Sequence, residues 1–499
     1  MSDPKVEILR SLEIGERVAE EEAEKLEQYF VETDQWRQMR DGDIDVVYGP
    51  KGSGKSALYT LLNRKEDEFF DRGILISSGE NLRGATVFRS IVADPPPSEL
   101  AFIYLWKLYC LTLIARTLRE YEVKNDDARC LVGSLEQARI LPATNTLSVI
   151  FRSVTTYLKN WLNRDAKSIE HAVTMDAQTG SPTVSRKVEF KEQSEEQNLG
   201  DIPVDELLEV ADRALEREAL TLWILFDRLD VAFADSPDLE RNALRALFRA
   251  YNDLKAHGRI SLKIFVRDDI WRRIIEGGFT EASHITKDLT ISWDAESLLN
   301  LIVLRLLNNA PLVEYLGVEA DAIRGNYQLQ TEFFSRLVPE KVDSGKNPHT
   351  FDWMVSRTTD STGKSAPREL IHLLDVAKDL QIKRLERGAD EPEGSELFDR
   401  SSFKEALPEV SRVRYEQTLL AEHPDLKQYL QKLEGEKCEQ TADSLSKLWA
   451  ISIEDAAQVA RRLADVGFFE IKGEKANPSY WVVFLYRGAL DLVQGKADL

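Results

Sequence analysis

The residues best suited to chemistry lie in one glycine-rich stretch, which matches the pattern G-x-x-x-x-G-K-[ST] at every fixed position. Glycines let backbone N–H groups turn inward around a phosphate, and the N-terminus of a following helix adds partial positive charge. In this pattern the lysine, Lys55, reaches the β- and γ-phosphates and the hydroxyl of Ser56 holds Mg²⁺. The stretch therefore predicts a nucleotide site. Its residues are Gly49, Pro50, Lys51, Gly52, Ser53, Gly54, Lys55, Ser56 and the following Ala57.

The flanking sequence supplies the elements that such a loop needs. Residues 44–48 are short, β-branched and bounded by glycine, which predicts a buried strand, and residues 56–62 carry apolar side chains at helical spacing. The alternative is a glycine turn with a chance lysine. The order strand, glycine loop, helix favours the phosphate-binding interpretation.

Two further strand ends carry charged residues. The apolar run 221–226 leads into Asp227, a carboxylate that can orient Mg²⁺ through a water beside the Ser56 hydroxyl. The run 260–266 leads into Arg267, which would stand at the carboxyl edge of a sheet, where ligands gather. The alternative for Arg267 is an exposed arginine in a salt bridge.

Five predicted strands, at 44–48, 73–77, 221–226, 260–266 and 288–293, alternate with helical patterns, and the helix predicted at 204–219 leads into the third strand. This alternation predicts an α/β fold, a P-loop-type parallel sheet with helices on both faces. Helical sequence follows, and within it Pro367 opens a helix whose next residue, Arg368, can point at a γ-phosphate from a lid. The expected domains are an acidic helical segment at 1–40, a core at 41–300 with an insertion at about 94–200, a helical lid at 301–410 and a winged helix at 411–499.

Within the insertion, two short extended runs flank Gln178-Thr179-Gly180-Ser181-Pro182. This arrangement is typical of a hairpin around a turn, here one that would protrude toward a partner. A disordered loop is the open alternative, because basic and acidic residues alternate along the segment.

The C-terminal segment predicts a winged helix. A short helix at 443–449, a second helix opened by the N-cap Ser452 and closed by Gly467, and two strands flanking residues 472–479 follow in the required order. The outward face of the second helix carries three acids and two bases, which makes it a poor reader of DNA. A protein-contact or structural role is therefore favoured over DNA binding. The face comprises Glu454, Asp455, Gln458, Arg461, Arg462 and Asp465.

Composition sets further bounds. The 499 residues include 65 Lys and Arg against 86 Asp and Glu, a net charge of −21 that opposes non-specific adhesion to nucleic acid or anionic membrane. The three cysteines, Cys110, Cys130 and Cys438, lie far apart, which fits a reducing cytoplasm and suggests neither disulfides nor a zinc site. The start is not a secretory signal, and the apolar run 101–115 is too short to span a bilayer and predicts a buried helix.

These motifs together resemble those of bacterial P-loop ATPases of the AAA+/STAND type, including relatives of the KAP and origin-recognition groups. The resemblance rests on residues 49–56, Phe226-Asp227-Arg228-Leu229-Asp230, Arg267 and Pro367-Arg368, and only the first of these motifs is specific by itself. It implies ATP and Mg²⁺ as ligands, Asp227 as the second-motif acid, Arg267 as a first-sensor-like arginine and Arg368 as a second-sensor arginine. It also places Arg17, in Gly15-Glu16-Arg17, beside the adenine.

The resemblance implies an ATP-driven conformational switch in bacterial stress or anti-phage signalling, acting through protein partners, with homo-oligomers that share sites. One departure concerns hydrolysis: Arg228 stands where many AAA+ enzymes have a water-activating glutamate. Asp230 is the first candidate to replace it and Glu80 the second. Two alternatives stay open, a DNA-binding ATPase regulator or loader and an ATP-binding scaffold without catalysis.

Overall fold

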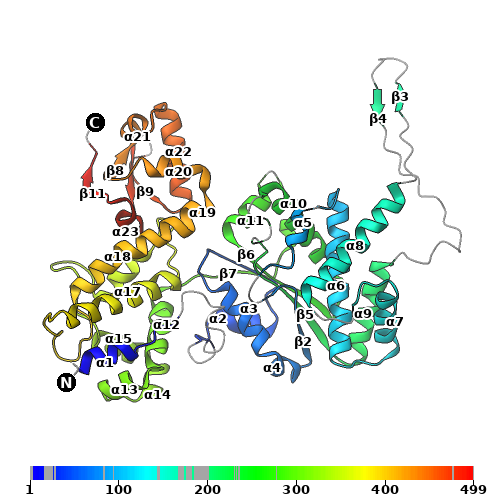
Figure 1. The fold of residues 1–499 in the computed structure, drawn as a ribbon, viewed down its shortest axis with the longest axis horizontal. Helices are drawn as coiled ribbons and strands as arrows, with labels where there is room; N and C mark the ends of the chain where they lie inside the picture. The colour runs from blue at the N-terminus through cyan, green and yellow to red at the C-terminus, as the bar shows by residue number, and fades with distance from the viewer. Residues whose placement is uncertain are drawn as a thin grey trace. The chain divides into compact units, whose positions relative to one another are not determined.

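The structure is a computed structural model that describes residues 4–15, 26, 30–81, 85–93, 95–142, 146–166, 173–175, 182–184, 202–229, 231, 233, 236–276, 278–474 and 477–497. The chain divides into two compact units. We call residues 38–48 and 58–289 the sheet unit, and residues 1–37, 49–57 and 290–499 the lid unit. Figure 1 labels the elements of both.

A five-stranded parallel sheet organises the first of these units, which confirms the predicted α/β class. Its strand order is β2-β5-β6-β1-β7. The last strand is shorter than the predicted 288–293, so Ile291 and Trp293 leave the sheet. The strands are β1 (Val46–Gly49), β2 (Ile74–Ser78), β5 (Thr221–Phe226), β6 (Ile260–Arg267) and β7 (Asp288–Thr290).

Helices cover both faces of this sheet, as the alternation of side chains along β5 shows. Leu222, Ile224 and Phe226 belong to the core shared with the long helices α6 and α10, whereas the Trp223 ring lies 5.2 Å from that of Phe69 in α4. The sheet is therefore buried on both sides, as near-continuous apolar strands require. The helices of this unit are α3 (Lys55–Arg64, which begins in the lid unit), α4 (Glu66–Phe70), α5 (Arg89–Ala93), α6 (Glu99–Glu120), α7 (Asp126–Gln137), α8 (Leu147–Ala166), α9 (Val204–Arg217), α10 (Pro237–Leu254) and α11 (Asp268–Ile275), with a 3₁₀ turn η2 (Thr280–His284).

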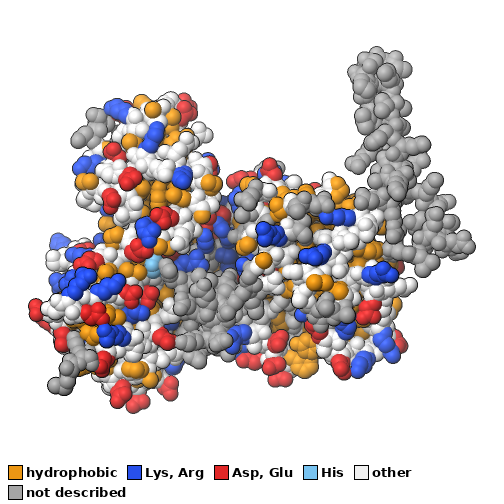
Figure 2. Space-filling view, viewed as in Figure 1, with side chains coloured by type: hydrophobic (Ala, Val, Ile, Leu, Met, Phe, Trp, Pro, Cys, Tyr) orange, Lys and Arg blue, Asp and Glu red, His pale blue; other side chains and the backbone are white. Residues whose placement is uncertain are grey.

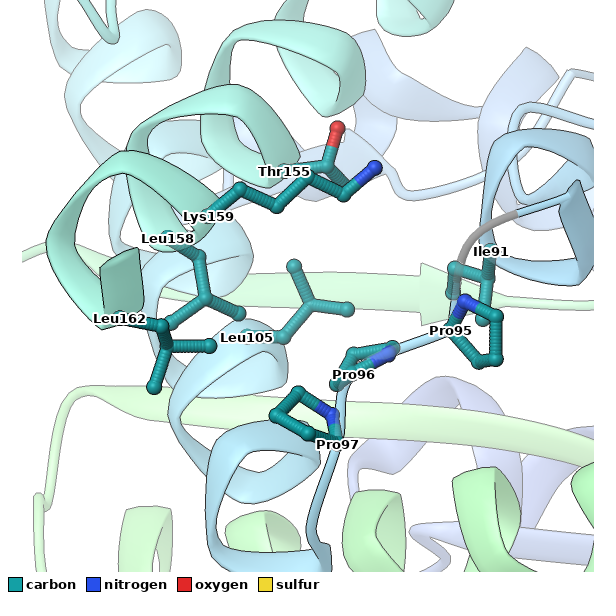
Figure 3. Close-up of a pocket in the computed structure, with 9 residues that line it drawn as sticks. All are labelled: Ile91, Pro95, Pro96, Pro97, Leu105, Thr155, Leu158, Lys159 and Leu162. Atoms are coloured by element: carbon teal, nitrogen blue, oxygen red, sulfur yellow. The ribbon is translucent and has the colours of Figure 1, made fainter. Parts of the chain in front are cut away.

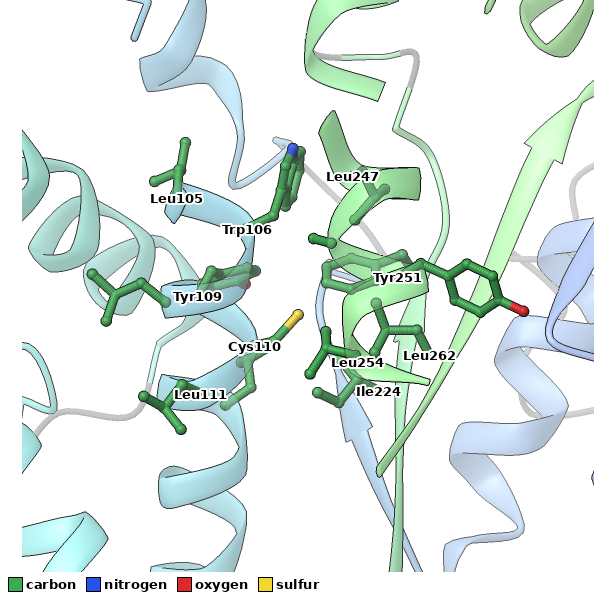
Figure 4. Packing of buried hydrophobic residues seen from close by; sticks show 14 of the residues in the cluster. Leu105, Trp106, Tyr109, Cys110, Leu111, Ile224, Leu247, Tyr251, Leu254 and Leu262 are labelled. Carbon is green, nitrogen blue, oxygen red and sulfur yellow. The ribbon is translucent and has the colours of Figure 1, made fainter. Parts of the chain in front are cut away.

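Helix α6 is the centre of the larger core. It begins after the N-cap Ser98, whose hydroxyl accepts the Ala101 N–H, and it packs against α10, where Trp106 Nε1 donates to the Ala243 carbonyl at 2.8 Å. Figure 4 shows Trp106, Tyr109 and Cys110 of α6 facing α10 and the sheet. Within the described residues α6 alone is long and apolar enough to cross a membrane, yet 72% of its apolar window is buried. The predicted buried helix is confirmed.

In the insertion, a short antiparallel hairpin follows α8. Its strands β3 (Val173–Met175) and β4 (Pro182–Val184) pair Val173 with Val184 and Met175 with Pro182. The second strand thus starts at Pro182, which the sequence had placed in the turn. The turn between the strands lies outside the described residues.

The lid unit has its own helical core, in which the N-terminal helix takes part. Leu9 and Leu12 belong to the same apolar cluster as the buried face of α12, whose N-cap Asp294 accepts the Ser297 N–H at 2.7 Å. The predicted acidic helix near the N-terminus is described only at its end, as α2 (Asp34–Asp41). The other helices are α1 (Pro4–Ser11), α12 (Ala295–Leu307), α13 (Ala310–Leu316), α14 (Ala320–Arg324), α15 (Tyr327–Ser335), α16 (Thr350–Thr358), α17 (Pro367–Glu386) and α18 (Arg400–Arg414).

The C-terminal part of this unit has the predicted winged-helix arrangement. Helices α21 and α22 are followed by the antiparallel strands β9 and β10. Phe469 lies opposite Val482 at one end of the pair and Glu474 opposite Asn477 at the other, so the strands extend further than predicted. Ser452 caps α22 as expected, by accepting the Asp455 N–H. The elements are a π-helical segment η3 (Tyr415–Leu419), α19 (Leu420–Glu422), η4 (Pro424–Leu426), α20 (Lys427–Gln431), β8 (Lys437–Thr441), α21 (Ala442–Trp449), α22 (Ile453–Asp465), β9 (Phe469–Glu474), β10 (Asn477–Val482), α23 (Phe484–Arg487), η5 (Gly488–Leu490) and β11 (Val493–Lys496).

This domain is anchored on α18. The Ala489 N–H donates to Ser411 Oγ at 2.8 Å, and the Arg414 guanidinium lies 3.0 Å from the Glu369 carboxylate of α17. Burial works against the charge on Arg414, but Glu369 raises its pKa above the ordinary value. The C-terminal domain therefore packs on α18, and α18 packs on α17 through Glu369, the residue next to Arg368.

Candidate nucleotide site

The glycine-rich loop follows β1 and leads directly into α3, in the order predicted from the sequence. Gly52 and Gly54 have φ values of +83° and +101°, a region that L side chains rarely adopt. A Cβ at Gly49 would lie 2.5 Å from Ser53 Oγ. A residue with a side chain would be strained or would clash at these three positions. Glycine is therefore needed for the backbone to follow this course, as expected of a loop whose amides turn inward.

Two polar side chains are buried inside the loop. Lys55 is 8% exposed, and its Nζ donates to the carbonyls of Gly49 at 2.8 Å and Pro50 at 2.9 Å. Ser53 is 1% exposed, and its hydroxyl has no hydrogen-bond partner among the residues that the structure describes. A buried ammonium beside a buried, unsatisfied hydroxyl fits an anion with several acceptor oxygens.

Another element of the same unit lies against this loop. Arg368, at the start of α17, lies so close to Gly52 that a Cβ there would be 3.1 Å from Arg368 Cβ and 3.4 Å from Nε. The structure therefore brings the predicted second-sensor arginine to the loop. Lys51 has a partner away from the loop: its Nζ donates to the Gln417 carbonyl of η3 at 2.7 Å.

Asp227 follows the last residue of β5 and is buried, with 4% exposed. In the sheet order, β6 separates β5 from β1, and all strands are parallel. Asp227, Arg267 and Gly49 thus end neighbouring strands at the same carboxyl edge. Topology assigns them to one edge, as the sequence predicted.

The position after Asp227 is conformationally unusual. Arg228 has φ +55°, and its Nη1 donates to the Asn81 carbonyl at 3.4 Å. Glu80, beside Asn81, is 1% exposed. Its carboxylate accepts the Thr86 hydroxyl at 2.5 Å and the Asn81 and Val87 N–H groups at 2.7 and 3.1 Å. Burial raises the pKa of Glu80, and these bonds together with the Arg228 charge oppose the rise. Glu80 therefore helps to close the turn after β2, and its part in hydrolysis stays a prediction.

Arg267 forms a two-pronged ion pair. Its Nε and Nη2 lie 3.0 and 2.9 Å from the carboxylate oxygens of Asp269, and both side chains are largely buried. Burial alone would raise the pKa of Asp269, but Arg267 and then Arg273 lower it below the ordinary value. Arg267 is thus in a salt bridge, although in a buried rather than an exposed place, and its sensor-like role stays a prediction.

Two predicted site residues, Arg17 and Asp230, lie outside the described residues, and their roles stay predictions. Sequence reasoning missed Trp293, which lies against the loop: its Nε1 donates to the Ser53 carbonyl at 2.8 Å. The residue was assigned to a strand, and a lone tryptophan carries no motif that would have revealed its position. In the described part of the chain, no three His, Cys, Asp or Glu side chains form a group that could hold a metal ion.

A separate cavity of about 260 Å³ lies in the sheet unit between α6, α8 and the proline segment (Figure 3). Its wall is mostly apolar, with one hydroxyl and one amine from α8, and so does not suit a triphosphate. It contains no predicted site residue. The lining residues are Ile91, Pro95, Pro96, Pro97, Leu105, Thr155, Leu158, Lys159 and Leu162.

No protein-family model and no curated protein matches the chain. Among solved structures, the Aeropyrum pernix ORC1 protein in complex with DNA is similar at 12% identity, with 92% of this chain and 90% of that chain covered and a TM-score of 0.35. The A. pernix ORC2 protein in ADPNP-ADP complexes is similar at 11% identity, with 94% and 91% covered and a TM-score of 0.30. These likenesses are weak and support no conclusion about family or activity.

Proposed function

We propose that the chain is an ATP-binding and ATP-hydrolysing conformational switch of the AAA+/STAND type. The observation that carries this proposal is the loop itself: two glycines at positive φ, the Lys55 ammonium inside the loop, the buried Ser53 hydroxyl and Arg368 against Gly52. The backbone amides, Lys55 and Arg368 would bind the phosphates. Ser56 and Asp227 would hold Mg²⁺, which neutralises phosphate charge when bound.

The lid unit gives the switch its output. A triphosphate that contacts both the loop and Arg368 would favour whichever state brings these groups together, because a ligand shifts an equilibrium only by its differential affinity for the two states. Arg368 is the second residue of α17, and α17 packs on α18, which carries the C-terminal domain. A change at the loop would therefore be transmitted through packed helices to protein partners. The bacterial stress or anti-phage signalling role, the cytoplasmic location and the homo-oligomer that the resemblance implies belong to the same proposal.

The test compares the two lysines of the loop. Lys55→Ala should weaken MgATP binding by more than about tenfold and abolish phosphate release, because it removes a charge-assisted contact to the phosphates. Lys51→Ala is the matched control, since the Lys51 side chain is bonded to Gln417 of η3. Calorimetric titration and phosphate-release assays measure both. Unchanged affinity and turnover in Lys55→Ala would refute the proposal.

The same assays separate a switch that hydrolyses ATP from a scaffold that only binds it. If Asp227 and Asp230 take part in hydrolysis, Asp227→Asn and Asp230→Asn should lower turnover with little loss of ATP affinity. Tight binding with no phosphate release from the unmodified protein would instead favour the scaffold, and Arg228 would then mark the loss of catalysis.

A further inference from the structure

Trp293 touches two successive residues of the phosphate loop. Its Nε1–H donates to the Ser53 carbonyl at 2.8 Å, and its Cζ2 is the nearest atom, at 3.8 Å, to a Cβ placed on Gly54. It stands immediately before Asp294, the N-cap of α12. The contact therefore joins the loop to the first turn of the lid helices.

The hydrogen bond fixes the orientation of one peptide unit. Because a trans peptide is planar, the Ser53 carbonyl and the Gly54 N–H point in opposite directions. With the carbonyl turned toward Trp293, the Gly54 N–H must face away from the indole. Gly52 and Gly54 are both at positive φ, and glycine lets the neighbouring peptide units rotate at little energetic cost. Without the hydrogen bond from Trp293, the Ser53–Gly54 peptide could therefore adopt the opposite orientation.

Ser53 is held on its other side too. Its N–H donates to the Pro50 carbonyl at 3.2 Å, and its buried hydroxyl points toward Gly49, inside the loop. That hydroxyl has no hydrogen-bond partner among the described residues. The Ser53 hydroxyl can therefore donate to a ligand in the loop. The backbone of the same residue is held by two hydrogen bonds, one at its N–H and one at its carbonyl.

We propose that Trp293 is a positioning residue for the phosphate site: it holds the Ser53–Gly54 peptide so that the Gly54 N–H and the Ser53 hydroxyl face the bound phosphates. Trp293 itself does not touch the nucleotide. The inference rests on the proposed function, because it assigns the residue that orders the same site.

The test removes the indole donor and keeps an aromatic ring. Trp293→Phe should lower the affinity for both MgATP and inorganic tripolyphosphate by about threefold to tenfold, the range expected for one hydrogen bond. The two losses should be equal, because the effect is confined to phosphate binding and tripolyphosphate has no base or sugar. Trp481→Phe is the matched control, since its Nε1 donates to Ser479 Oγ at 3.1 Å in the C-terminal sheet.

Each outcome of the titrations decides one of the two ideas. If the unmodified protein binds neither ligand, the proposed function is wrong and the inference falls with it. If it binds both and Trp293→Phe binds them equally well, the inference alone is overturned. Thermal unfolding of each variant checks that the fold is retained, and Trp293→Leu, which also lacks a donor, replaces a Phe variant that does not fold.

Discussion

Gly79 stands at the end of β2, where the backbone meets the aromatic core. A Cβ there would lie 2.4 Å from the Phe226 ring and 3.0 Å from the Leu225 carbonyl, neither of which can move without displacing β5. Gly79→Ala should therefore reduce the free energy of unfolding by about 1–3 kcal/mol, as overpacked cores do. Urea unfolding followed by circular dichroism measures the loss.

Gly133 is the matched control for this substitution. It lies within α7, and a Cβ there meets nothing within 4 Å. Gly133→Ala should raise the free energy of unfolding by about 0.5–1 kcal/mol, because alanine loses less backbone entropy than glycine in a helix. Equal effects at the two glycines would show that the packing against Phe226 is not as described.

Asp269 supplies a pH-dependent prediction. Its folded pKa lies below the ordinary 3.8, because Arg267 and Arg273 outweigh the effect of burial. A depressed carboxyl pKa contributes stability that is full above the unfolded pKa and is lost as the pH falls through the folded pKa. Asp269→Asn should therefore destabilise the protein at pH 7, and the difference from the unmodified protein should shrink only below about pH 4. Urea midpoints between pH 7 and about pH 2.5 test this; a difference that stays constant below about pH 4 would contradict it.

At the scale of elements, β6 and the start of β1 are joined by a buried ion pair. Lys263 Nζ lies 2.9 Å from Asp45 Oδ1 and donates to the Ile44 carbonyl at 2.7 Å. The Tyr251 hydroxyl donates to the other Asp45 oxygen at 3.1 Å, and the Trp223 ring centre is 4.4 Å from the ammonium. Burial lowers the pKa of Lys263, and Asp45 opposes this. These partners together compensate the Lys263 ammonium and the Asp45 carboxylate for the hydration that both lose on burial.

Removing one partner should cost more than removing both. Lys263→Met leaves the Asp45 carboxylate buried without its ammonium, which should destabilise the protein by about 3–5 kcal/mol. Adding Asp45→Asn should recover part of that loss, because the uncompensated charge is gone. A double-mutant cycle from urea unfolding measures the coupling, and strictly additive effects would rule out the pair as described.

The ion pair also illustrates what the sequence could and could not reveal. Strand β5, the N-caps Ser98, Asp294 and Ser452 and the phosphate loop follow from local patterns, because each depends on residues a few positions apart. Partners such as Lys263 and Asp45, or Trp293 and Ser53, are separated by more than 200 residues. No local pattern encodes such contacts, and so the residues that brace the loop were missed while the loop itself was predicted.

At the scale of the whole molecule, charge decides which partners the surface can bind. The net charge is −21, and acidic and basic side chains are interspersed over the visible face of the C-terminal domain (Figure 2). On α22 the predicted outward residues are all exposed, and Arg462 is paired with Asp425 at 2.6 Å. The bases on this helix are therefore partly neutralised before any ligand arrives.

DNA binding should accordingly be weak and insensitive to these arginines. Neutralising phosphates with Lys and Arg supplies most non-specific affinity, with Kd values of roughly 10⁻⁴–10⁻⁶ M at physiological salt for proteins that have the charge to do so. We expect duplex DNA to bind this chain no more tightly than the weak end of that range, and Arg461→Ala with Arg462→Ala to leave the result unchanged. Fluorescence anisotropy with labelled duplex at 50 and 200 mM salt, with and without MgATP, is the measurement. Tight binding that falls steeply with salt and is lost in the double variant would instead make the C-terminal domain a DNA reader, because only a basic surface produces that combination.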